Sequence, residues 1–516
     1  MIFQSGFTDL QVLLLLIAGL TFLAGLLYQI RGKEYLSMGF LLFTALLIFC
    51  SAALLDPFLN LWDERFHALV AKNLMNHPLR PTLYDDPIVN MPYYRWDRYI
   101  VWLHKQPLFL WQIALSFKLF GVSEFTLRLP DVVMGTILVF AGYRTGKLLV
   151  NQRVGFIAGA MIISSGYLVD LVAGRQELDH NDFSFLFYVS MSIWAWTEYI
   201  FSRKKYWIVL IGCFSGFAIL CKWLAGLLIY LGWLTWNLQQ TKSRMTRFRE
   251  LLVALLISIV IALPWQVFMF CTYPSEAIET YRLNATHFLS PVDGQNGSVW
   301  YHFEKFGIIY GVVSSFLIIP GFCILRKTII EKSLFIPLVS MVLAVYLFFT
   351  IAATKMVSYT ALVIMIMFLA LASLYEFIFR WLSELFNNPV WKNSAYCAGV
   401  MGMVIIQFNL GYLQARHTEN AQDPYFRNLL HNREVFRSLE LPPNSVLFNV
   451  KGRHYVEAMF YTGLPAYPFI PTCDQCQELK RKGRVIAVFK TPSMKIPTCM
   501  TLDPTLIIID QKISGE

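Results

Sequence analysis

Long apolar segments recur along most of this sequence and place the strongest constraint on its fold. A helix needs about 20 largely apolar residues to cross a bilayer, and about twelve such stretches are present. They lie near residues 10–29, 36–55, 127–149, 155–173, 182–201, 206–220, 222–237, 250–271, 305–325, 333–352, 356–379 and 396–414. Only 15% of the 516 residues are charged, whereas soluble proteins carry about 25%. The sequence therefore predicts an all-α polytopic membrane protein and excludes a soluble multidomain enzyme.

Basic residues gather in every second loop between the predicted spans. The six loops contain Arg31 and Lys33; Arg144, Lys147 and Arg153; Arg203, Lys204 and Lys205; Lys242, Arg244, Arg247 and Arg249; Arg326, Lys327 and Lys332; and Arg380 and Lys392. Because Lys and Arg collect on the cytoplasmic side of membrane proteins, these loops predict an N-terminus on the outer side. The net charge of +10 is then a consequence of topology, and we predict no binding of nucleic acid.

Two of the remaining loops are long and are predicted to lie outside the cytoplasm. They cover residues 56–126 and 272–304 of a transmembrane part, residues 1–415. The first contains amphipathic stretches, which are typical of helices lying at the membrane interface.

The last part of the chain, residues 416–516, has the composition of a soluble domain. Residues 445–450 and 485–490 indicate strands, and residues 456–462 and 475–482 indicate helical turns. We predict a small extracytoplasmic α/β domain. Within it, Cys473 and Cys476 indicate either a local disulfide or free thiols.

Acidic and basic residues at the edges of the predicted spans are candidates for chemistry. Asp63 and Glu64 follow a span, where a carboxylate can deprotonate a hydroxyl group arriving from water; alternatively, they complement the dipole of a helix N-terminus. Lys105, preceded by His104, suits a phosphate group, although an interfacial lysine can also simply extend to water.

Three further regions on the predicted outer side carry polar groups. Residues 174–182 include Arg175, Asp179 and Asp182, which suit a cation or a sugar, or form a solvated hairpin loop. Lys222 and Lys355 each interrupt an apolar stretch, which favours an anionic lipid head group as partner; alternatively, each lysine simply extends to water. The second long loop mixes polar and aromatic groups that suit a carbohydrate. Its members are Arg282, Asn284, His287, Asp293, Trp300, Tyr301 and His302.

Four motifs taken together resemble the GT-C membrane glycosyltransferases that use polyprenyl-phosphate sugars. The resemblance is to the branch of protein O-mannosyltransferases and the lipid A aminoarabinose transferase. The motifs are Asp63-Glu64-Arg65-Phe66-His67-Ala68; Lys105-Gln106-Pro107-Leu108; Leu263-Pro264-Trp265; and Thr354-Lys355-Met356 with Tyr359. Their order and spacing cover about residues 36–380.

The resemblance implies a GT-C fold and assigns roles to several residues. Asp63 would be the general base, supported by Glu64, with Asp179 or Asp182 as a second acid near the acceptor. Lys105 and Lys355, with Tyr359, would hold the carrier phosphate and stabilise its charge as it leaves. Gln106, His104 and Gln295 depart from the family pattern, so neither the sugar nor a metal site is carried over.

We therefore expect an inverting glycosyltransferase that moves a sugar from a polyprenyl-phosphate carrier to a hydroxyl group of a glycolipid, polysaccharide or protein. The expected location is a bacterial inner membrane, with the site and the C-terminal domain on the periplasmic side. No cofactor is required; if a divalent cation binds, His104 and His287 are its first candidate ligands. Two alternatives stay open: a transporter or flippase of an isoprenoid-linked glycan, and a non-catalytic sensor whose tail binds a ligand.

Overall fold

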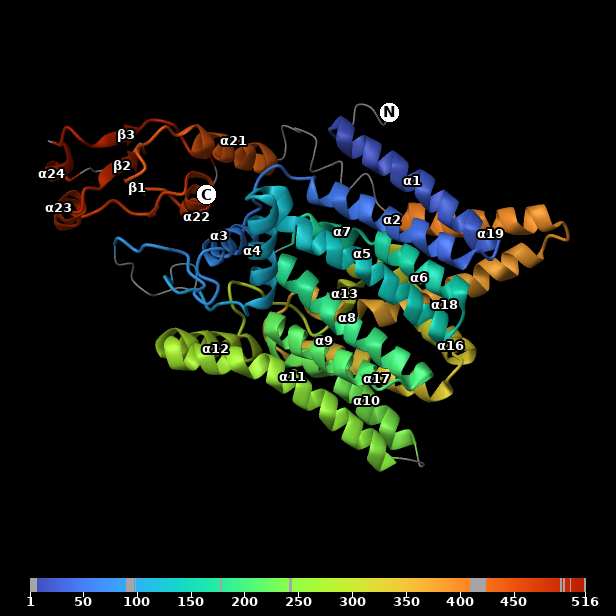
Figure 1. The fold of residues 1–516 in the computed structure, drawn as a ribbon. Helices are drawn as coiled ribbons and strands as arrows, with labels where there is room; N and C mark the ends of the chain where they lie inside the picture. The colour runs from blue at the N-terminus through green and yellow to red at the C-terminus, as the bar shows by residue number, and fades with distance from the viewer. Residues whose placement is uncertain are drawn as a thin grey trace.

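Helices form one large bundle, and a smaller region with a sheet lies beyond one end of it (Figure 1). The structure is a computed structural model that describes residues 7–89, 97, 99–176, 179–240, 244–408, 424–491, 494, 497–501 and 503–514. The predicted domain boundary at residue 415 and the basic residue Lys242 lie outside the described residues. The chain is thus mostly helical, as the apolar segments predict.

The bundle consists of α1 (Asp9–Ile30), α2 (Glu34–Ala53), α5 (Glu124–Leu149), α6 (Gln152–Ser164), α7 (Gly166–Val172), α8 (Asp179–Ser202), α9 (Tyr206–Lys222), α10 (Leu228–Gln239), α11 (Arg244–Thr272), α16 (Ile318–Thr328), α17 (Phe335–Ile351), α18 (Ile364–Glu384) and α19 (Pro389–Gln407). Within the described residues, seven helical segments are long and apolar enough to cross a membrane. The number rises to eight if the bent pair α6 and α7 forms one span. The chain is a polytopic membrane protein, but this count does not reach the twelve predicted spans.

Part of the difference between the predicted and the observed number of spans comes from helices that are too short to count as separate spans. Residues Tyr206–Gln239 form one apolar stretch, yet the chain reverses direction inside it. Gly226 lies against the backbone of Ala218 and Ile219, and the Ser215 hydroxyl donates to the Gly226 carbonyl at 2.8 Å. A straight helix would separate Gly226 from Ile219 by about 10 Å. Hence α9 and α10 form a hairpin around the short 3-10 helix η3 (Trp223–Leu227).

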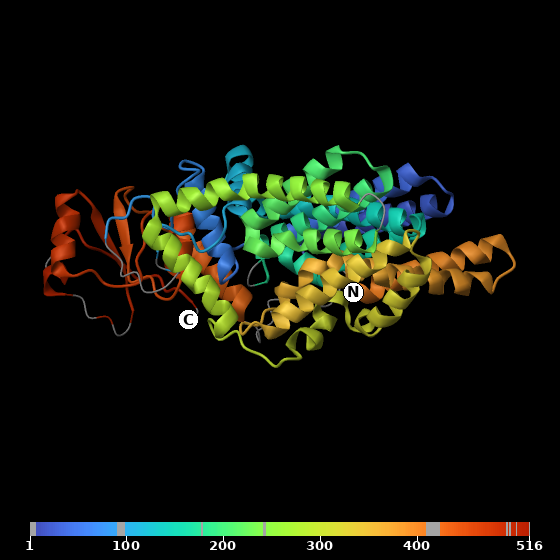
Figure 2. The same ribbon diagram turned by 90° about the horizontal axis from the view of Figure 1, so that it is seen from below.

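The basic loops lie together at the end of the bundle opposite to the sheet. Arg203 and Arg247 both stack on the ring of Trp236, at 5.1 and 4.9 Å. Trp236 also donates to Ser333, and Lys147 pairs with Glu34. These contacts join loops that are far apart in the sequence, and the α18–α19 hairpin projects from the same end (Figures 1 and 2).

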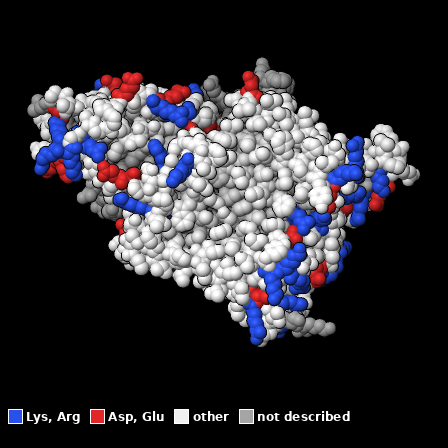
Figure 3. Space-filling model, in the orientation of Figure 1, with Lys and Arg blue, Asp and Glu red and all other residues white. Residues whose placement is uncertain are grey.

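A broad belt without charged groups separates the two ends of the molecule. Figure 3 shows Lys and Arg concentrated at the basic end, and charges of both signs at the end that carries the sheet. Large apolar side chains of α1, α11 and α17 are exposed, among them Leu20, Val260 and Leu343. Uncharged apolar surface of this extent fits the hydrocarbon core of a bilayer.

The C-terminal region contains a three-stranded parallel sheet with helices beside it. Its strands are β1 (Ser445–Phe448), β2 (Val485–Phe489) and β3 (Ile507–Ile509), in that order, with Val446 opposite Ile486 and Val488 opposite Ile508. Its helices are α21 (Pro424–Ser438), α22 (His454–Thr462), α23 (Cys473–Arg481) and α24 (Thr498–Thr501).

The expected local bridge between Cys473 and Cys476 is wrong. Cys473, in the first turn of α23, forms a disulfide with Cys499 of α24, with 5.9 Å between the Cα atoms. Cys476 is buried as a free thiol. Because helix α23 turns Cys476 towards the core of the region, only Cys473 reaches the neighbouring helix.

The C-terminal region shares one hydrophobic core with the first long loop. That loop folds into α3 (Asp63–Leu74) and α4 (Leu108–Phe120), which lie between the bundle and the sheet in Figure 1. Phe66 of α3 and Phe117 of α4 belong to the same buried cluster as Phe460 and Val446. The second long loop contributes α12 (Pro274–Leu289), and shorter helices α13 (Tyr301–Glu304), α14 (Phe306–Tyr310) and α15 (Val312–Phe316) follow it.

Close contact between α5 and α6 yields a test of the bundle. A Cβ atom at Gly155 would overlap the carbonyl oxygen of Tyr143, and one at Gly146 would lie 2.8 Å from the Gly155 Cα atom. Because backbone cannot move aside cheaply, we expect Gly155→Ala to lower stability by about 1–3 kcal/mol. Thermal unfolding in detergent measures this. Gly39→Ala is the control, since nothing lies within 4 Å there; equal melting temperatures would contradict the helix crossing.

Candidate active site

Helix α3 begins at Asp63 and carries the predicted acidic pair in its first turn, where carboxylates complement the helix dipole. The two carboxylates have different surroundings. Asp63 lines a cavity between α3, α8, α9, α12 and α17, whereas Glu64 is fully buried. Asp63 can therefore contact a substrate, whereas Glu64 stabilises the surrounding structure.

The cavity has a volume of about 550 Å³ and brings together residues from across the chain. Among the residues predicted from sequence, it is lined by Asp63, His104, Lys105, Asp182, His287 and Tyr359. Apolar groups, including Phe185 and Leu362, form much of the remaining wall. A cavity with an apolar wall and a few convergent charges is the usual form of a ligand site.

Two ammonium groups face two carboxylates inside this cavity. The Lys105 Nζ atom lies 2.8 Å from Asp63 Oδ2, and Lys222 forms an ion pair with Asp182. The Lys222 ammonium also lies 4.8 Å from the centre of the Tyr359 ring. These two ion pairs carry no net charge. An anion that enters the cavity would therefore have to compete with Asp63 and Asp182 for the two ammonium groups.

Strained backbone marks the same cavity. Five residues other than glycine have a positive φ within the described chain, and three of them, Trp62, Trp223 and Asp293, line the cavity. Trp62 (φ 64°) directly precedes Asp63, and Trp223 (φ 67°) directly follows Lys222. Such conformations cost about 1–3 kcal/mol each, persist where the surroundings enforce them, and cluster at functional sites.

His104 and His287 lie in the cavity wall, where the sequence suggests a weak cation site. Burial, together with Lys105 and Lys222, lowers the pKa of His287 to about 4. Burial and Lys105 also hold the pKa of His104 well below its usual value. The same positive charges oppose a divalent cation, so these residues fit a resident metal ion poorly.

Within the described residues, one group of three side chains has the spacing of metal ligands: Glu64, Asp179 and His180. Glu64, however, already binds the guanidinium group of Arg128 through both carboxylate oxygens. A cation at this point would have to displace that pair. The donor set therefore fits a structural ion-pair network better than a metal site.

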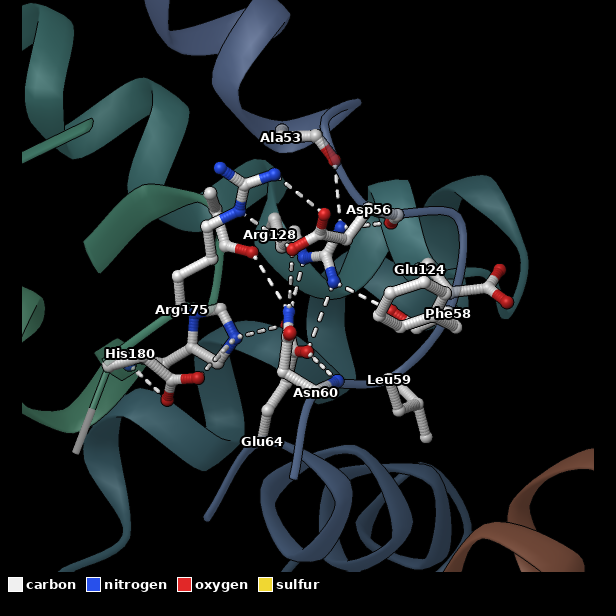
Figure 4. A network of polar contacts seen from close by, with 12 residues as sticks. Ala53, Asp56, Phe58, Leu59, Asn60, Glu64, Glu124, Arg128, Arg175 and His180 are labelled. Atoms are coloured by element: carbon white, nitrogen blue, oxygen red, sulfur yellow. Dashed lines mark hydrogen bonds and ion pairs between the residues drawn. The ribbon is translucent and has the colours of Figure 1, made fainter. Parts of the chain in front are cut away.

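Arg128 is the centre of this buried network (Figure 4). Its Nε and Nη2 atoms donate to the two oxygens of Glu64, at 2.8 and 3.0 Å. The other three N–H groups donate to the carbonyl oxygens of Ala53, Asp56 and Phe58 at 2.6–3.1 Å. All five donors of the guanidinium group are satisfied. Arg128 thereby fixes the chain that leads from α2 into α3.

Neighbouring groups complete the network around Glu64. Burial raises the pKa of Glu64, but Arg128 and His180 more than offset this effect and hold the pKa below its usual value. The backbone amide of Asn60 donates to the Glu64 carboxylate. Gly174, at φ 73°, leaves the space that this side chain fills, because a Cβ atom there would overlap it.

Arg175 and Asp179, predicted as substrate and catalytic residues, are also buried. Arg175 forms a two-pronged ion pair with Asp56 at 2.7 and 2.8 Å (Figure 4). Asp179 lies 3.2 Å from the Nδ1 atom of His67, which is one turn after Asp63 on α3. Asp179 is thus tied to α3, while Asp182, on the next turn of α8, reaches the cavity.

Asn284 and Asp293 also line the first cavity, whereas Lys355, Arg282, Trp300, Tyr301 and Arg175 lie outside it. Lys355 donates to the carbonyl oxygens of Phe349 and Thr350 at the end of α17, at 3.0 and 2.6 Å. Arg282 and Trp300 are exposed. Tyr301 and Arg175 line a second cavity of about 920 Å³. The two cavities meet at Gln295, Met356 and Ser358.

Lys222 lines the cavity, and the sequence suggested an anionic head group as its partner but did not place it among the residues that hold the carrier phosphate. Its signal was a single charge within an apolar stretch, and Lys355 gave the same signal. The tertiary structure distinguishes the two lysines. The α9–α10 reversal turns Lys222 towards Asp182, whereas the Lys355 ammonium group donates to backbone carbonyls. Arg128 and Glu64 are 64 positions apart in the sequence, and His67 and Asp179 are 112 positions apart. No local motif indicates contacts over such distances.

The buried pair yields a prediction for stability. Arg128→Met would leave the Glu64 carboxylate without its counterion, so we expect a loss of about 3–5 kcal/mol in unfolding free energy. Thermal unfolding in detergent measures it, and adding Glu64→Gln to the same chain should recover part of the loss. Arg282→Ala, at an exposed ion pair, should cost at most about 1 kcal/mol. Equal melting temperatures for the two single variants would refute the role of Arg128.

Comparisons with known sequences agree with the predicted resemblance. The sequence model of the dolichyl-phosphate-mannose-protein mannosyltransferase family matches residues 104–268. An uncharacterized protein of Aquifex aeolicus is 27% identical over 173 residues, which are 33% of this chain and 31% of that protein. An undecaprenyl phosphate-alpha-4-amino-4-deoxy-L-arabinose arabinosyl transferase of Pseudomonas fluorescens is 25% identical over 205 residues, or 37% and 35%. The matches span about a third of the length of these curated relatives.

Solved structures share the fold over most of the chain. ArnT from Cupriavidus metallidurans, bound to undecaprenyl phosphate, matches with a TM-score of 0.62 and 14% identity over 90% of this chain and 88% of ArnT. The oligosaccharyltransferase AglB from Archaeoglobus fulgidus, in complex with an inhibitory peptide and a dolichol-phosphate, matches with a TM-score of 0.52 and 12% identity, covering 83% of this chain and 63% of AglB. The chain therefore has the fold of the GT-C membrane glycosyltransferases, and the resemblance predicted from its motifs is confirmed.

Proposed function

We propose that this protein transfers a sugar from a polyprenyl-phosphate carrier to an acceptor hydroxyl group, with inversion at the anomeric carbon. One observation carries the proposal: a single cavity holds a carboxylate, Asp63, beside two lysines, Lys105 and Lys222, against an apolar wall. A base, a phosphate site and an apolar surface for an isoprenoid chain are the three parts that this reaction needs.

In the proposed reaction, Asp63 accepts the proton of the acceptor hydroxyl as its oxygen attacks the anomeric carbon. The bond between that carbon and the phosphate oxygen breaks, and polyprenyl phosphate leaves with the bonding electrons. Lys105 and Lys222 stabilise the charge that develops on the leaving oxygen, which is electrostatic stabilisation of the kind that dominates many enzymes. A single displacement of this kind inverts the configuration and uses no metal ion.

The ion pairs in the cavity suggest how the donor prepares the base. Without donor, Lys105 is neutralised by Asp63 and Lys222 by Asp182. A phosphate group between the two lysines would compete with both carboxylates for the ammonium groups. Asp63 would then lose part of its cationic partner and become the stronger base at the moment when the donor is in place. Tyr359, against Lys222, would help to hold that ammonium group in the cavity.

The position of each further residue refines its proposed role. Asp182 lines the cavity, so it is the acid that can contact a sugar or an acceptor. Asp179 acts through His67 and Glu64 through Arg128, and both position α3. Lys222 takes the phosphate-binding role that the sequence gave to Lys355. The acceptor would be a glycolipid, a polysaccharide or a protein hydroxyl group.

Two features support a site on the extracytoplasmic face, in a bacterial inner membrane. The cavity is lined by the start of α3, the end of α9 and α12, and these elements and the C-terminal region lie away from the basic loops in Figure 1. Basic loops are typical of the cytoplasmic side. The Cys473–Cys499 disulfide belongs to this same end. Disulfides persist in oxidising compartments such as the bacterial periplasm.

Asp63→Asn tests the base and the ion-pair exchange together. Transfer from radiolabelled undecaprenyl-phosphate sugar in proteoliposomes should fall by about 10²–10⁴-fold, because general-base catalysis is lost. Binding of undecaprenyl phosphate should become tighter, because Lys105 no longer has a competing counterion. Glu279→Gln, an exposed acid on α12, is the control and should change neither quantity. Unchanged transfer by Asp63→Asn would refute the base, and weaker lipid binding would refute the exchange.

A matched pair of lysine variants tests the phosphate site. Lys222→Gln should lower the transfer rate by about 10²–10³-fold, as expected when one charge-stabilising donor is lost. Lys355→Gln should leave donor binding unchanged, because Lys355 contacts the end of α17 instead of the cavity. Steady-state transfer and undecaprenyl phosphate binding measure both effects. The opposite ranking of the two variants would return the phosphate role to Lys355.

A further inference from the structure

We propose that the C-terminal region positions the general base, holding the start of α3 through a buried Arg65–Glu457 ion pair and two tyrosine hydroxyl groups. This inference rests on the proposed function of Asp63. Arg65, Glu457 and the tyrosines are positioning residues, because within the described structure they act on α3 and the strand of chain before it, and none of them lines either cavity.

The ion pair joins α3 directly to the C-terminal helix α22. Arg65 lies two residues after Asp63, and its Nη1 atom is 3.1 Å from Glu457 Oε1. Both side chains are almost fully buried, with 2% and 3% of their surface exposed. The second oxygen of Glu457 lies 2.9 Å from His454 Nδ1. Water cannot substitute for either partner here, so the relative position of the two helices is fixed by this contact.

The chain leading into α3 is held by hydroxyl groups from the same region. The Leu59 amide donates to the Tyr461 hydroxyl at 3.1 Å, and the Leu61 amide donates to the Tyr425 hydroxyl at 3.2 Å. Tyr425 in turn donates to the Asn60 side-chain oxygen at 3.2 Å. These backbone amides precede a helix whose N-cap residue makes no side-chain capping bond. The C-terminal region therefore holds the chain directly before α3, next to a helix start that has no side-chain cap.

Trp62 shows why such support is needed. It has a positive φ of 64°, a conformation that a tryptophan keeps only where its surroundings enforce it. The guanidinium group of Arg453, from the C-terminal region, lies 4.8 Å from its ring. At the other end of α3, the Lys72 ammonium donates to the Phe460 carbonyl at 2.7 Å. The helix that presents Asp63 is thus held at both ends by residues of the C-terminal region.

Attachment of the C-terminal region to α3 would not by itself require the buried Arg65–Glu457 ion pair. The shared hydrophobic core already attaches the C-terminal region to α3 and α4. Buried ion pairs add little net stability compared with apolar residues of similar volume, but they impose a defined geometry. A base must lie within hydrogen-bonding reach of the proton that it accepts, so a small displacement of α3 lowers the rate of the chemical step.

Glu457→Gln is the main test, in the full-length protein reconstituted with undecaprenyl-phosphate sugar. It keeps the side-chain shape and removes the charge. We expect kcat to fall by about 10- to 100-fold, as for a misplaced catalytic group, with KM for donor and acceptor within about twofold of wild type. Glu457→Asp, which restores the charge, should recover part of kcat. The matched control is Arg484→Gln, which breaks another ion pair between the same region and the first loop, with Asp86, away from α3.

The outcomes separate this inference from the assignment of the base. If Asp63→Asn is inactive and Glu457→Gln has the kcat of Arg484→Gln, the positioning role is refuted and the base stands. If Asp63→Asn remains active, the base assignment itself is refuted. Should Glu457→Gln fail to fold, Tyr425→Phe decides the question, since it removes one hydroxyl group. It should lower kcat at an unchanged melting temperature, and a kcat equal to that of wild type would overturn the proposal.

Discussion

The buried ion pair between Glu64 and Arg128 is the interaction on which the rest of the site depends. An unpaired charge at a fully buried position is very costly, so each of these residues requires the other. Arg128 also donates to three backbone carbonyl oxygens, one at the end of α2 and two in the chain between α2 and α3. One guanidinium group therefore sets where α2 ends, where α3 begins and how both meet α5.

This constraint separates the functions of two adjacent acids. Glu64 turns into the network, and because α3 is held by that network, the preceding residue is directed into the cavity. Asp63 then meets Lys105, and the reversal between α9 and α10 brings Lys222 to Asp182 on the opposite side. The candidate site contains two ion pairs, together with Asp293, in an apolar cavity, and a phosphate-bearing lipid is the kind of ligand that would rearrange the pairs.

Much of the architecture and part of the site could be predicted from the sequence. Apolar length predicts a membrane bundle, and the motifs around Asp63 and Lys105 predict the GT-C fold and two residues of the cavity. The predicted spans 206–220 and 222–237 correspond to α9 and α10, which the reversal at Trp223 separates, but composition does not show that α6 bends into α7. Sequence alone also cannot choose between Lys222 and Lys355, since both are lone charges in apolar stretches and differ only in their tertiary neighbours.

The sequence by itself determined that this chain lies in a membrane, because the free energy of burying apolar segments in lipid depends on composition and length alone. It also determined which acidic and basic residue types are available at the ends of the helices. Only the tertiary structure decided which of them meet. Glu64 and Arg128, Lys222 and Asp182, and Arg65 and Glu457 are 64, 40 and 392 positions apart. Such contacts arise from packing, because a buried charge must find a partner wherever the fold brings one within reach.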